Sequence, residues 1–192
     1  MASALRCSHL NRALCLGGHL RQDHPVWEVY DLLRTAKLNE KYFGYRLQKY
    51  VRINNFMEFA IAATASTSAI ASLTLWNEGL AGHFWQSFLV ISAVISVAKP
   101  ILGITKRVRL YEEVLSEYRA LSYELMQLKV GISTAREYNE IHIDKFNEIM
   151  EKHATLVSKS PESTENKTVK TTCIDEVIKA YPPENFFIPK GI

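Results

Sequence analysis

A long window with almost no charge, in the middle of the chain, constrains the fold most. Between Phe59 and Ala98 the only ionisable side chains are Glu78 and His83, and nearly all Lys and Arg residues lie outside this window. The net charge of the 192 residues is only +3, so the average composition does not show this segregation. A split of this kind favours a chain that meets two solvents, water and lipid.

The window contains two apolar runs, which predict a transmembrane helical hairpin. The first, residues 59–76, spans roughly 27 Å as a helix, and the second covers residues 84–104. The turn WNEGLAGH between them has no Lys or Arg, whereas basic residues flank both runs on the outside. By the positive-inside rule, this pattern predicts a multi-pass membrane protein with both termini in the cytoplasm.

The sequence on either side of the window predicts amphipathic helices, so the expected fold class is an all-α membrane protein. A helix is expected to begin near Pro25, because apolar and basic residues alternate there with a helical period. We expect a flexible N-terminal extension over 1–24, a cytoplasmic amphipathic helix over 25–55, the transmembrane hairpin over 56–105, a cytoplasmic helical or coiled-coil region over 106–157, and a flexible polar linker with a C-terminal docking tail over 158–192.

Apolar residues after the second run recur at spacings close to a heptad, which predicts a short coiled coil or a bundle helix. We expect this stripe to act as an assembly seam. The seam consists of Leu110, Val114, Tyr118, Leu121, Leu125 and Leu128, and Ile132 continues it. Gly131 marks a break, and Thr134 with Glu137 then has the pattern of a capping box that opens another helix.

The small polar residues of the first run predict one special helix face. Thr64, Thr67, Ser68 and Ala71 share one arc at 100° per residue. Small side chains let helices pack closely, so this arc is either a packing face between helices or subunits, or the lining of a pore in an oligomer. Glu58 and Lys99 would lie at the pore mouth, where Glu58 is either an interfacial carboxylate near Arg52 or part of an acidic ring.

The sequence gives no sign of catalysis, so we expect no enzyme, no cofactor and no metal site. The six histidines and three cysteines form no HExxH, Glu-x-x-His or CxxC pattern. No phosphate-binding glycine motif occurs, and the mild charge predicts no sequence-specific binding of nucleic acid. Phe186 and Phe187, flanked by prolines, form either a docking peptide for a controlling partner or a tail folded onto the chain's own helices.

The order of these parts resembles the SLATT family of small bacterial proteins with two transmembrane helices flanked by cytoplasmic helices. The matching features are the hairpin, the helix KRVRLYEEVLSEYRALSYELMQL, and a basic-aromatic run before the first span, and they cover residues 25 to 130. That run contains Lys41, Tyr42, Tyr45, Arg46, Leu47 and Tyr50. The resemblance implies an inner-membrane effector, or toxin, of a bacterial anti-phage defence system.

By that resemblance, the expected action is to oligomerise, permeabilise or depolarise the membrane, and cause abortive infection. The expected partners are membrane lipid, further copies of the chain, and a separately encoded sensor. This sensor would be a retron reverse transcriptase–msDNA complex or, as in CBASS, a nucleotide-signalling enzyme. The alternative is a non-lytic membrane scaffold, or a small channel accessory subunit, that recruits a cytoplasmic complex.

Overall fold

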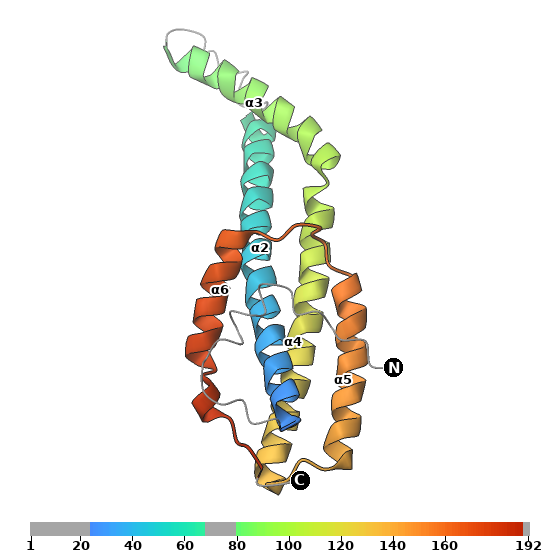
Figure 1. The fold of residues 1–192 in the computed structure, drawn as a ribbon. Helices are drawn as coiled ribbons and strands as arrows, with labels where there is room; N and C mark the ends of the chain where they lie inside the picture. The colour runs from blue at the N-terminus through green and yellow to red at the C-terminus, as the bar shows by residue number, and fades with distance from the viewer. Residues whose placement is uncertain (1–23, 68–79, 190–192) are drawn as a thin grey trace. The chain divides into compact units, whose positions relative to one another are not determined.

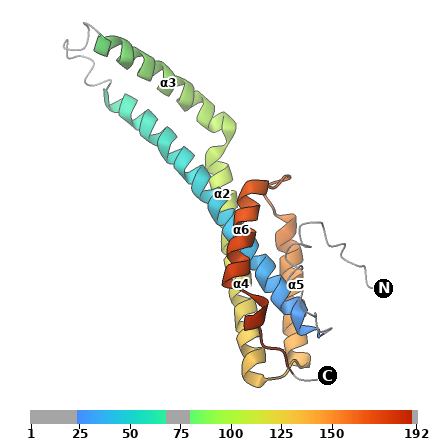
Figure 2. The same ribbon diagram turned by 60° about the vertical axis from the view of Figure 1, so that its left-hand side comes forward.

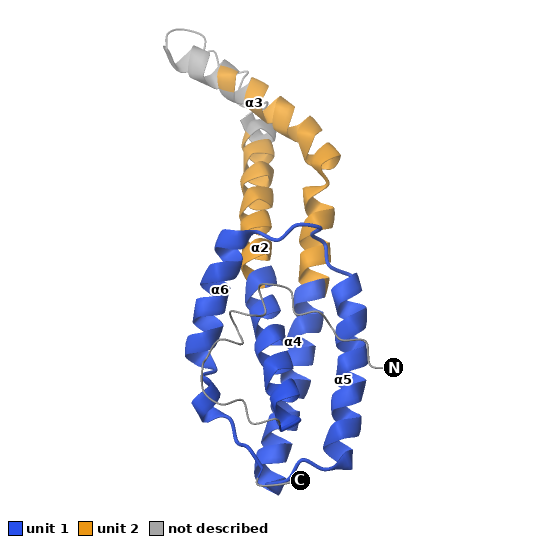
Figure 3. Cartoon of the chain, viewed as in Figure 1, with its two compact units in different colours: residues 1–43, 114–192 blue, residues 44–113 orange. Residues whose placement is uncertain are grey.

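A computed structural model describes residues 24–67 and 80–189, and this part of the chain forms helices and no strand (Figure 1). The elements are α2 (Val26–Thr67), α3 (Leu80–Leu102), α4 (Ile104–Ala135), α5 (Glu140–Ser158), α6 (Lys167–Ala180) and the short 3-10 helix η2 (Pro183–Asn185). The all-α prediction is therefore confirmed for these residues. The chain divides into two compact units, which Figure 3 colours separately: unit 1 is residues 1–43 with 114–192, and unit 2 is residues 44–113.

The prediction of a multi-pass protein of the bacterial inner membrane, with both termini cytoplasmic, is wrong. Across residues 24–67 and 80–189, no helix combines the length and the apolar character that crossing a bilayer requires. What was predicted as a separate first span begins inside the 42-residue helix α2, directly after turns that carry Arg52 and Glu58. The last turn of α3 likewise contains Lys99 and Pro100. Residues 68–79 of the predicted hairpin lie outside the described part.

Unit 1 is built around the N-terminal half of α2 and most of α4, with α5 and α6 against them. The ring of Phe43 on α2 stacks on that of Tyr118 on α4, with centroids 5.4 Å apart. Lys152 of α5 pairs with Glu124 of α4 at 2.9 Å, and Lys159, the C-cap residue of α5, pairs with Glu117 of α4 at 2.7 Å. The buried apolar side chains of this unit include Val29, Leu33, Ala36, Leu121, Leu125, Ile132, Phe146, Ile149, Leu156 and Val177.

The turn between α4 and α5 differs from the predicted one. Helix α4 runs through Gly131 to Ala135, and Arg136 then adopts a left-handed conformation with φ of 56°. The capping box at the start of α5 is formed by Asn139 and His142, whose backbone and side-chain groups bond reciprocally, and not by Thr134 and Glu137. Histidine can take the place of the usual Glu or Gln because Nδ1 accepts the Asn139 N–H.

The segment over 158–192, predicted as a flexible linker with a docking tail, contains a helix, because α6 begins at Lys167. The side chain of Asn166 accepts a hydrogen bond from the Val169 N–H at 3.1 Å and caps this helix. Helix α6 runs beside α2 in both Figure 1 and Figure 2. Lys41 of α2 donates to Glu176 of α6 at 2.6 Å, and Cys173 and Val177 are buried completely.

Unit 2 consists of the second half of α2, helix α3 and the first turns of α4. Tyr50 and Tyr111 stack with their centroids 5.1 Å apart, and the guanidinium of Arg46 lies 5.6 Å from the Tyr50 ring centre. Helices α3 and α4 are separated only by Gly103, whose φ of +59° is unfavourable for residues with a side chain. This glycine allows the chain to end one helix and start the next without an intervening loop.

Ser122 is a buried polar residue for which we predict a stabilising substitution. It is 0% exposed on α4, and its hydroxyl has no hydrogen-bond partner within residues 24–67 and 80–189. Because a buried group without a partner is destabilising, Ser122→Ala is expected to raise the free energy of unfolding by about 1–2 kcal/mol in urea titrations. Ser116→Ala makes the same exchange at an exposed position of α4 and measures the helix-propensity contribution alone. A less stable Ser122→Ala protein would contradict the prediction.

Candidate functional site

The most unusual surface of the described chain is an apolar face of α3, which we call the α3 face. It consists of Val90, Val94, Val97 and Ile101, at spacings of four, three and four. Their side chains are 64%, 63%, 63% and 78% exposed. With Ala93 and Ala98 between them, they line a shallow groove of about 500 Å³. Exposed apolar side chains gathered on one helix in this way are typical of a surface that binds another protein.

The opposite side of α3 holds the helix against α2 within unit 2. Ser92 is 2% exposed, and its hydroxyl donates to the carbonyl of Ala60 at 3.2 Å. Lys99, seven residues further along, donates to Glu58 Oε1 at 2.8 Å. At 100° per residue, Ser92 and Lys99 lie about half a turn away from the α3 face. The face is therefore exposed because α3 uses its polar side for its own packing.

Glu58 and Lys99, predicted as residues of a pore mouth, are brought together as an ion pair. The Lys99 hydrogen bond and, after it, a bond from Asn54 at 3.0 Å hold the pKa of Glu58 below its ordinary value. The carboxylate thus stays charged at neutral pH and fixes the side of α3 that faces α2. The ion-pair partner of Glu58 within the chain is therefore Lys99, whereas the sequence interpretation placed this carboxylate near Arg52. The alternative of an acidic ring in an oligomer stays a prediction.

The structure does not describe the side chains of the predicted small-residue arc. Thr64 and Thr67 belong to the last turns of α2, but their side chains are outside the described part of the structure. Ser68 and Ala71 lie outside the described residues altogether. The assignment of this arc to helix packing or to a pore therefore stays a prediction.

Most residues of the predicted assembly seam are buried within unit 1 of the same chain. Val114, Tyr118, Leu121, Leu125 and Leu128 are each 6% exposed or less. All of them belong to the core of unit 1, and only Leu110, in unit 2, is 40% exposed. A heptad-like spacing shows that one side of a helix is covered, but it does not distinguish a neighbouring helix of the same chain from another copy.

The C-terminal tail lies on the chain's own helices, which was one of the two interpretations of Phe186 and Phe187. Phe186 is 7% exposed and stacks on Tyr30 of α2, with centroids 4.4 Å apart. The hydroxyl of Tyr30 donates to the carbonyl of Phe187 at 2.6 Å. The aromatic and proline content of the tail signalled a docking segment, but nothing in the sequence specified its receptor.

Residues with catalytic or metal-binding chemistry are scattered in the described part of the structure. In residues 24–67 and 80–189, no group of three or more His, Cys, Asp or Glu side chains is arranged to hold a metal ion. His142 caps α5, and His153 packs edge-on against Tyr118, where burial lowers its pKa. Burial raises the pKa of the Cys173 thiol to about 11, which disfavours the reactive thiolate.

Sequence analysis did not single out the α3 face as an exposed apolar row, although its spacing was present in the sequence. The spacing of Val90, Val94, Val97 and Ile101 is that of a seam, but we assigned the whole run to lipid because Leu, Ile and Val dominate it. Comparison with known proteins adds no further assignment, because no protein family, no curated protein and no solved structure matches this chain.

Proposed function

We propose that this chain is a non-enzymatic assembly protein whose copies associate through the α3 face. The observation that supports this proposal is the exposure of Val90, Val94, Val97 and Ile101 on a helix whose other side is engaged with α2. Ile91 and Leu102, which are 55% and 54% exposed, flank this row and widen the exposed apolar surface of α3. An exposed apolar patch of this kind is typical of an interaction site.

A second copy is the occupant that the α3 face fits best. Side chains spaced four, three and four residues apart form the knobs of a helix–helix seam, and the alanines beside them leave room for a facing helix. Interfaces between identical subunits are also more apolar than other protein interfaces. Phe56 and Phe59 of unit 2, 67% and 70% exposed, would supply additional apolar area.

The association is tested by placing charge on the α3 face. Wild-type protein is expected to sediment as an oligomer, and a Val94→Lys/Val97→Lys variant as a monomer, with a dissociation constant raised about 100-fold or more. Ser96→Lys is the control, because Ser96 is exposed on the same helix but lies about 130° from the α3 face. A wild-type protein that stays monomeric at about 100 μM, or a double variant that still associates, would contradict the proposal.

We further propose that this association is the effector step of an anti-phage system, as the resemblance to SLATT proteins implies. A separately encoded sensor would release or trigger it. The test expresses wild-type and Val94→Lys/Val97→Lys chains, with and without their genomic neighbours, and records viability during phage infection. An effector loses its protective growth arrest when the α3 face is charged. A scaffold that only recruits other proteins leaves the viability of uninfected cells unchanged in every combination.

A further inference from the structure

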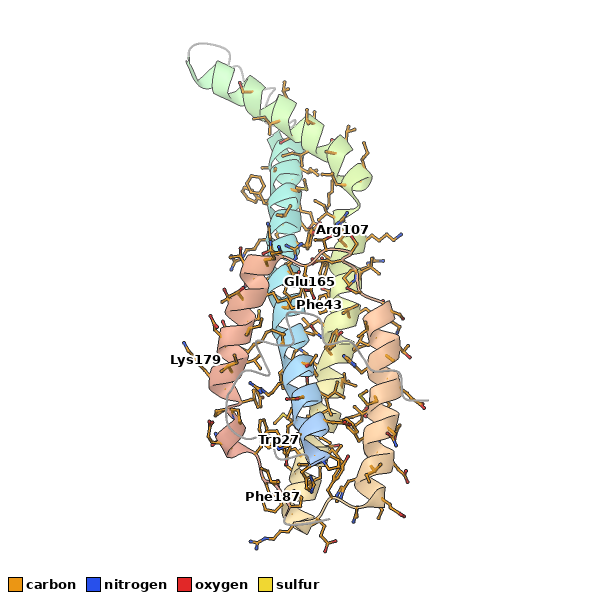
Figure 4. The ribbon with its side chains drawn as sticks, viewed as in Figure 1. Trp27, Phe43, Arg107, Glu165, Lys179 and Phe187 are labelled. Atoms are coloured by element: carbon orange, nitrogen blue, oxygen red, sulfur yellow. The ribbon has the colours of Figure 1, made fainter. Side chains whose placement is uncertain are left out.

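An aromatic seat in unit 1 holds the C-terminal tail. It is formed by Trp27 and Tyr30 of α2 together with Lys129 of α4, and its occupant is Phe186. The Tyr30 and Phe186 rings are nearly parallel, at 14°, while the Trp27 ring meets Phe186 edge-on with centroids 6.3 Å apart. The Lys129 ammonium lies 4.8 Å from the Phe186 ring centre. Figure 4 shows Trp27 and Phe187 near the same end of unit 1.

The seat recognises the backbone of its occupant as well as the ring. The Tyr30 hydroxyl donates to the carbonyl oxygen of Phe187, the residue after the anchor. Pro182 and Pro183 follow Tyr181, the C-cap residue of α6, and the backbone of Pro182 and of Phe186 is extended. Proline limits the conformations available to the unbound segment, which lowers the entropy lost on binding. These features define the ligand class as a short peptide in which a 3-10 turn leads into an extended Phe anchor.

The tail leaves part of the seat unused. Among the described residues, the indole Nε1 of Trp27 is buried without a hydrogen-bond partner, which is destabilising for a donor shielded from water. The same anchor ring that Trp27 touches also lies under the Lys129 ammonium, which attracts negative charge. A carboxylate next to the Phe anchor would offer the Trp27 N–H a stronger acceptor than the amide oxygen of Asn185, and it would also supply a counter-charge for Lys129.

We propose that this seat is a binding site for a Phe-anchored acidic peptide of a separately encoded partner, and that the tail is its weaker resident ligand. A tethered segment competes at an effective concentration in the millimolar range, so an identical tail from a second copy would not displace it at ordinary concentrations. A partner must therefore bind with higher affinity than the tail. It can gain this affinity by accepting a hydrogen bond from the Trp27 N–H and by placing a negative charge near Lys129. The proposal uses only unit 1 and does not depend on the α3 face.

The test titrates the full chain with two fluorescent peptides: residues 181–189, YPPENFFIP, and the same peptide with Asn185→Asp. Phe186→Ala in the protein empties the seat, so this variant is expected to bind the Asp peptide at least tenfold more tightly than wild-type protein does. In the Phe186→Ala protein, the Asp peptide is expected to bind about threefold to tenfold more tightly than the Asn peptide. Adding Tyr30→Ala is expected to abolish binding of both.

Two further variants keep the seat folded while they remove single groups. In the Phe186→Ala background, Tyr30→Phe retains the stacking ring and is expected to weaken both peptides about fivefold through loss of the hydroxyl donor. Trp27→Phe removes the buried N–H and is expected to shrink the difference between the Asp and Asn peptides. Equal affinity of wild-type and Phe186→Ala protein, equal affinity of the two peptides for the emptied seat, or no binding at about 1 mM would each overturn the proposal.

Discussion

Replacing Leu125 with alanine is expected to lower the free energy of unfolding by about 2–5 kcal/mol. Leu125 is 0% exposed on α4, in the core of unit 1. The substitution removes buried apolar atoms and leaves a cavity, because closely packed neighbours relax only partly. Urea titrations followed by circular dichroism would measure the change as a shift of the unfolding midpoint at constant slope.

Val130→Ala is the matched control for this experiment, because Val130 lies on the same helix in the same unit but is 61% exposed. It is expected to change the free energy of unfolding by no more than about 0.5 kcal/mol. If Leu125→Ala were as harmless as Val130→Ala, the side of α4 that we place in the core would be wrong.

Removing the hydroxyl of Tyr42 is expected to loosen α6 without unfolding the chain. This hydroxyl donates to Glu162 Oε2 and accepts the backbone N–H of Asn166 at 2.8 Å. Asn166 is the N-cap of α6, so one phenol on α2 fixes both the approach to this helix and its first turn. In Tyr42→Phe, the aromatic ring stays and only these bonds are lost, at a cost of about 1–3 kcal/mol.

The readout is the alkylation rate of Cys173, which is 0% exposed and reacts only when α6 opens. Each 1.4 kcal/mol lost corresponds to about tenfold faster labelling, and peptide mapping by mass spectrometry separates Cys173 from Cys7 and Cys15. Thr171→Ala is the control, because this exposed α6 residue bonds only within its own helix, to Lys167 O at 3.0 Å. An unchanged rate in Tyr42→Phe would show that its hydroxyl does not hold α6 in place.

Helical periodicity carried most of the fold prediction, and it was correct where local interactions decide the structure. The repeat through Val114, Leu121 and Leu125 marked the buried side of α4, and the start near Pro25 agrees with α2 beginning at Val26. Periodicity could not reveal what covers that side. The seam was therefore assigned to other copies of the chain, although its partners lie in the same unit.

Polar details at helix ends and on α3 were the parts that the sequence could not settle. His142 acts as a capping residue only because its side chain bonds back to Asn139, and Asn166 was read as part of a linker. The membrane prediction rested on the apolar content of two runs. It did not consider that Ser92 and Lys99 could pack α3 against α2 through its polar side. The seat of Phe186 joins residues far apart in the sequence, so no local sequence pattern could have predicted it.

The hydrogen bond from Tyr30 to Phe187 connects residues 157 positions apart. During synthesis at about 5–20 residues per second, the beginning of α2 leaves the ribosome on the order of 10 s before its final neighbour exists. Throughout that interval, Trp27 and Tyr30 present bare aromatic rings to whatever the nascent chain meets. A chaperone that binds exposed aromatic side chains would find a target there until the tail arrives.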